Sequence, residues 1–62
     1  MEGITQAELT EAVQALTSMI SKLEKARVGL SPTAKSQITL IDRRIKALSI
    51  ALTLITQELD AG

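Results

Sequence analysis

Three cations stand close together in the sequence and are the residues best suited to a chemical role. Arg43, Arg44 and Lys46 lie within four consecutive positions, and Lys and Arg side chains bind the phosphates of nucleic acids. The chain has no Phe, Tyr or Trp to stack on bases, and its formal net charge is zero. Binding would therefore be weak and sensitive to salt. These residues form a candidate anion or nucleic-acid patch, and a small dimeric RNA-binding regulator is the alternative function that they predict.

Catalytic chemistry has no comparable candidate. The chain has no His, Cys or Tyr, which are among the usual general acids, bases and nucleophiles. Glu8 and Glu11 share a helix face, but two acids near a helix start serve solubility and the helix dipole. Without Cys and His, no structural zinc site is expected. The sequence predicts a non-enzymatic protein with no cofactor and no metal.

Two helices must position these side chains, and the second has the clearer pattern. Its apolar residues alternate at spacings of three and four, which is typical of a helix that lies along another helix. These residues are Ile38, Ile41, Ile45, Leu48, Leu52, Ile55 and Leu59. We expect this helix over about 32–60, with Ser31 as its N-cap and Pro32 as its first residue.

The first helix is expected over about 6–28. Thr5 and Glu8 have the spacing of a capping box, and Ile4 and Leu9 that of a hydrophobic staple. Gly29 is expected to end the helix in the left-handed conformation. The apolar stripe is wide enough for a helical bundle; it comprises Leu9, Ala12, Val13, Leu16, Met19, Ile20, Leu23 and Ala26. A turn as short as 29–31 makes the two helices antiparallel neighbours.

The chain is expected to be one all-α helical-hairpin domain, residues 1–62. A chain of 62 residues buries little surface and usually needs a disulfide, a metal or a partner chain. Because the sequence has no Cys and no metal site, the partner chain remains. We therefore expect an antiparallel homodimeric four-helix bundle, or a higher oligomer.

The second helix has more apolar surface after Lys46 than one neighbouring helix can cover. Ala47, Ile50, Ala51 and Leu54 form a second strip beside the main seam. Scattered exposed aliphatic residues are tolerated on protein surfaces, but four together indicate an interface. The residues predicted to carry association with a second copy or another protein are Leu48, Ile50, Ala51, Leu52, Leu54 and Ile55.

Charge is divided along the chain. All seven basic residues lie between Lys22 and Lys46 with two acidic ones, and the other five acidic residues lie outside that segment. The turn half of the hairpin is thus basic and its open half acidic. Three interpretations remain open: complementarity to the helix dipoles, self-recognition between antiparallel copies, and an anion-binding patch.

The second helix resembles that of the small hairpin co-chaperones of bacterial type III secretion systems. The resemblance covers about twenty residues of this helix, and the residues that carry it are Lys46-Ala47-Leu48 followed by Ile50, Leu52, Leu54 and Ile55. The chain lacks the aromatic residues that this family often carries there. It implies that the apolar strip holds a partner protein. Plasmid copy-number regulators, which are dimers of helical hairpins that bind paired RNA, offer an analogy of shape alone.

The N-terminal residues have neither the basic nor the apolar region of a signal peptide. The longest uncharged run, residues 47–57, is shorter than the ~20 apolar residues of a membrane span. We expect a cytoplasmic protein that does not bind membranes.

Overall fold

The first helix, α1, begins at a capping box. The computed structural model describes residues 2–61, and α1 spans Gln6–Val28, the range that the sequence predicts. The backbone N–H of Glu8 donates to Thr5 Oγ1, and the N–H of Thr5 donates to Glu8 Oε1, both at 3.1 Å. This reciprocal pair satisfies two donors that a helix start otherwise leaves without partners. The predicted capping box is therefore confirmed.

The end of α1 differs from the prediction. Gly29 has φ −79° and ψ −8°, so its backbone is right-handed and the predicted left-handed conformation is wrong. Its N–H still donates to the carbonyl of Lys25 at 3.3 Å, and the N–H of Leu30 donates to that of Arg27 at 3.2 Å. The last carbonyls of α1 thus gain partners without the left-handed residue that usually supplies them.

The connection between the helices is longer than the predicted residues 29–31. The hydroxyl of Ser31 accepts from the N–H of Thr33 at 3.3 Å, and the carbonyl of Ser31 accepts from the N–H of Ala34 at 2.9 Å. These bonds close a tight turn with Pro32 at its second position, which suits the fixed φ of proline. The predicted start of an α-helix at Pro32 is wrong because residues 31–34 form this turn instead, and α2 begins only after it, at Lys35.

The second helix, α2, spans Lys35–Ala61. Its first α-helical bond runs from the N–H of Ile38 to the carbonyl of Ala34, at 3.0 Å. Ala34 therefore occupies the N-cap position, where it offers no side-chain acceptor. No acidic residue lies in the first turn, so this end of α2 is much less stabilised than the start of α1.

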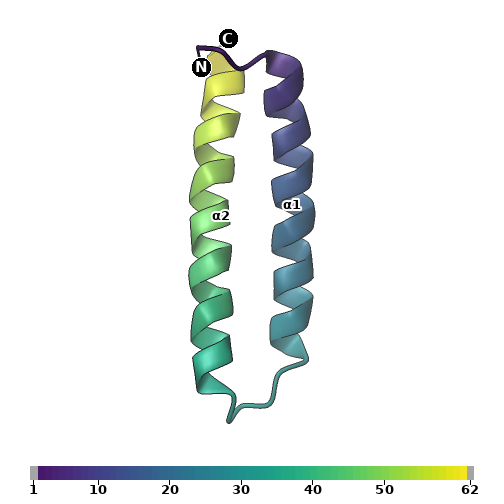
Figure 1. The fold of residues 1–62 in the computed structure, drawn as a ribbon, viewed down its shortest axis with the longest axis vertical. Coiled ribbons are helices and arrows are strands. Elements are labelled where there is room, and N and C mark those ends of the chain that lie inside the picture. Colours follow the sequence, from purple (N-terminus) through teal and green to yellow (C-terminus); the bar gives the residue numbers. More distant parts are fainter. Residues whose placement is uncertain (1, 62) are drawn as a thin grey trace.

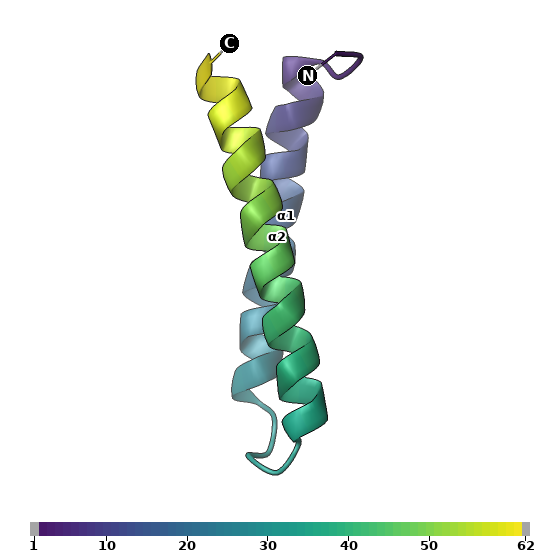
Figure 2. The same cartoon turned by 90° about the vertical axis from the view of Figure 1, so that its left-hand side faces the viewer.

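The two helices form an antiparallel hairpin with both termini at one end and the turn at the other (Figure 1). They cross at a shallow angle, as Figure 2 shows, and the hairpin is a rod of 45 × 17 × 14 Å. The seven seam residues of α2 predicted from the sequence are all half-buried. Leu9, at 4% exposure, is the only buried side chain among residues 2–61. The hairpin therefore has a seam, but hardly a core.

Candidate protein interface

The six residues predicted to carry association divide between two surfaces of α2. Leu48, Leu52 and Ile55 occupy seam positions and are half-buried. Ile50 and Leu54 remain 53% and 55% exposed, on the side of α2 that α1 does not cover. Ala51 is half-buried at the margin between them. Leu40 and Ala47 are also exposed. We call these four exposed residues and Ala51 at their margin the outer strip: Leu40, Ala47, Ile50, Ala51 and Leu54.

A groove lies between the two helices next to the outer strip. It has a volume of about 490 Å³ and is lined by Met19, Lys22 and Leu23 of α1 and by Arg44, Ala47 and Leu48 of α2. The lining is apolar apart from Lys22 and Arg44, which supply only positive charge. This groove suits an apolar side chain that has a carboxylate close to it.

Sequence reasoning placed Met19 in the seam and missed this groove. Met19 is 48% exposed because the seam is open beside it. The signal lies in Ala47, which is one heptad from both Leu40 and Leu54. A small side chain between two leucines on one helix face leaves a hollow.

A second, shallower hollow of about 250 Å³ lies on the outer side of α2. Its lining combines Ile50 and Leu54 with the polar residues Lys46, Ser49 and Thr53. Ile50 is thus bordered by polar side chains. Leu54 is also close along the helix face to Ala47 and Ala51, which are seven and three residues before it.

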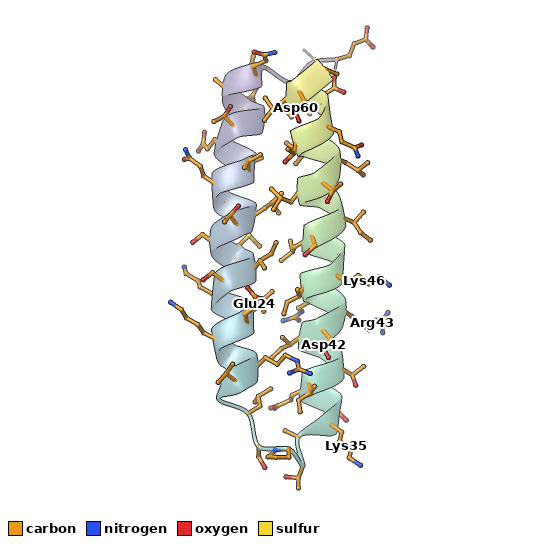
Figure 3. The ribbon with its side chains drawn as sticks, turned by 180° about the vertical axis from the view of Figure 1, so that it is seen from behind. Glu24, Lys35, Asp42, Arg43, Lys46 and Asp60 are labelled. Atoms are coloured by element: carbon orange, nitrogen blue, oxygen red, sulfur yellow. The ribbon has the colours of Figure 1, made fainter. Side chains whose placement is uncertain are left out.

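The structure does not bring the three predicted anion-binding residues into one cluster. Arg44 lines the groove together with Lys22. Arg43 and Lys46 point away from α1 at the outer edge of α2, as does Lys35 near the turn (Figure 3). Neighbouring residues on a helix project about 100° apart, which separates Arg44 from Arg43. Arg43 and Lys46, three residues apart, share the outer edge of α2 instead (Figure 3).

An ion pair that the sequence did not reveal joins the helices near the turn. Arg27 Nε donates to Asp42 Oδ1 at 2.6 Å, and Arg27 Nη2 donates to Asp42 Oδ2 at 3.3 Å. The hydrogen bond from Arg27 and then the charge of Asp42 raise the pKa of the Arg27 guanidinium. The pair is solvent-exposed, so it contributes to helix register more than to stability.

The acidic residues form no alternative site. The carboxylate of Glu8 is engaged by Thr5 in the capping box. Within residues 2–61, no three acidic side chains are close enough together to hold a metal ion. Over the same residues, neither helix has a stretch long and apolar enough to cross a membrane.

In comparisons with known proteins, the chain matches no family model, no curated protein and no solved structure.

Proposed function

We propose that the chain is a non-enzymatic oligomerisation and adaptor module that binds protein through the faces of its helices. Its smallest assembly is a homodimeric four-helix bundle in which a second hairpin covers the outer strip of α2. The observation that carries this proposal is how much surface one hairpin leaves exposed.

The exposed surface area of the hairpin is larger than expected for a chain of this size. A folded monomer of 6.6 kDa typically exposes about 3,900 Å², whereas this hairpin exposes 4756 Å². The excess is of the order of the ~800 Å² that each partner buries in an interface of standard size. Leu40, Ile50 and Leu54 are all about half-exposed on α2. A second chain on this face would lower the exposed area per chain to the typical value and would cover these three apolar side chains.

Sedimentation equilibrium tests the proposal directly. The wild-type chain should be a dimer or higher oligomer at micromolar concentration. The double variant Ile50→Glu with Leu54→Glu should be monomeric, because two apolar side chains that the second hairpin covers would be replaced by carboxylates that lose their hydration in the bundle. Gln14→Glu with Gln57→Glu is the matched control, since it adds the same charge at exposed polar positions and should leave the assembly intact. A folded wild-type monomer at these concentrations refutes the proposal.

The resemblance of α2 to type III secretion co-chaperones supports the adaptor part of the proposal. A partner protein with a long amphipathic helix would occupy the same strip as the second copy, so the two would compete. A co-expressed partner of this kind should convert homodimers into a heteromeric complex, and the Ile50→Glu, Leu54→Glu variant should not be captured. A ternary complex that keeps the homodimer intact would show that the partner uses another face.

A further inference from the structure

We propose that the groove is the acceptor for Leu54 and the acidic end of α2 from a second copy, so that the two hairpins dock with their turns at opposite ends. This inference rests on the proposed self-association and adds the orientation of the copies and the residues that select it.

The sequence of α2 carries a second heptad pattern on the side of the groove. The spacing of its members alternates between four and three, as along a helix–helix seam. They are Leu40, Arg44, Ala47, Ala51, Leu54, Glu58 and Ala61. The first heptad seam of α2 faces α1, so this second one is available to another chain.

The order of residues along this second seam is self-complementary only in the antiparallel direction. With the two-fold axis near Ala51, Leu54 of each copy lies near Ala47 and Ala51 of the other, where small side chains leave room. Arg44 of each copy then lies within about one helical turn of Glu58 of the other. In a parallel dimer Arg44 would face Arg44 and Leu54 would face Leu54. Opposite charges and complementary sizes therefore favour the antiparallel pair.

The groove is complementary to the segment of α2 that the second copy would place in it. Leu54 and Glu58 are four residues apart and share a helix face, so the second copy presents an apolar side chain with a carboxylate beside it. The groove offers Met19, Leu23 and Leu48 to the leucine, and Lys22 and Arg44 to the carboxylate. A two-fold dimer has two such contacts, because each copy supplies both the groove and the leucine.

The distribution of charge along the hairpin favours the same antiparallel orientation of the two copies. Asp60 lies at the open end and Lys35 near the turn (Figure 3), and all basic residues lie in the turn half. Turn-to-turn docking would bring the two basic halves together, whereas the opposite orientation pairs basic with acidic halves.

Charge exchange tests the pairing. Arg44→Glu and Glu58→Arg should each weaken dimerisation about ten-fold at low salt, since each places like charges together at two symmetric contacts. The double variant Arg44→Glu, Glu58→Arg should recover most of the wild-type affinity. Lys35→Glu is the matched control, because it makes the same charge change near the turn, beyond the end of the second seam (Figure 3), and should have little effect.

Cross-linking tests the orientation independently. The wild-type chain has no Cys, so single Cys variants Leu40→Cys and Ala61→Cys can be mixed and oxidised. The antiparallel pair predicts disulfides between the two different variants, whereas a parallel pair predicts disulfides within the Leu40→Cys variant.

The outcomes separate this inference from the proposed function. Recovery in the double variant together with mixed disulfides supports the inference. A dimer that is insensitive to both charge changes, or equally weakened by Lys35→Glu, or linked mainly through two Leu40→Cys chains, overturns the inference but leaves self-association standing. A monomer overturns both.

Discussion

Replacement of Leu9 by Ala tests how much one buried side chain contributes to a hairpin that has almost no core. Leu9 is 4% exposed and belongs to the first turns of α1. This end of α1 lies beside the end of α2 (Figure 1). Truncation of a buried Leu costs about 2–5 kcal/mol. The lower part of this range, about 2–3 kcal/mol, applies here because the open end of the hairpin lets water fill the space that is left.

Urea denaturation followed by circular dichroism measures this loss. A chain of this size has a total stability of about 3–9 kcal/mol and a denaturant slope of about 1 kcal/mol/M, so the midpoint should fall by about 2 M or more. Wild type and variant must be compared at one protein concentration, because association raises apparent stability.

Val28→Ala is the control for the Leu9 experiment. Val28 is 86% exposed at the end of α1, so its truncation removes almost no buried surface and should shift the midpoint by less than about 0.5 M. If Leu9→Ala and Val28→Ala gave equal shifts, Leu9 would not be buried in the folded protein.

Three further predictions follow from the helix ends and the cations. Gly29→Ala should stabilise the protein by about 0.4–1 kcal/mol, since the backbone is right-handed and an added Cβ would meet only the carbonyls of α1 at 3.6 Å or more; destabilisation in a thermal melt would indicate a left-handed residue. Ala34→Ser should add about 1 kcal/mol by capping α2, and an unchanged denaturation midpoint would mean that α2 begins elsewhere. In a low-salt gel shift, duplex RNA should bind weakly at most, because Arg44 is separated from Arg43 and Lys46; tight binding that Arg43→Ala with Arg44→Ala abolishes would favour the RNA-binding alternative.

The helices and their pairing could be predicted from the sequence because both depend on local patterns. The capping box needs only Thr5 and Glu8 at the correct spacing. The seam of α2 follows from the period of its apolar residues, and the shortness of the connection makes the helices antiparallel. The excess of apolar residues after Lys46 is also visible in the sequence. Which of them lie in the seam and which in the outer strip is not.

Other features depended on the positions of the two helices relative to each other. The conformation of the connection is one of them: Gly29 is right-handed and residues 31–34 close a turn, although the same residues also match a left-handed helix end and a helix start, so their local preferences did not decide between the two. The pairing of Arg27 with Asp42 and the groove beside Met19 depend on which turn of α1 lies opposite which turn of α2. The heptad pattern leaves this register open, because it repeats every seven residues.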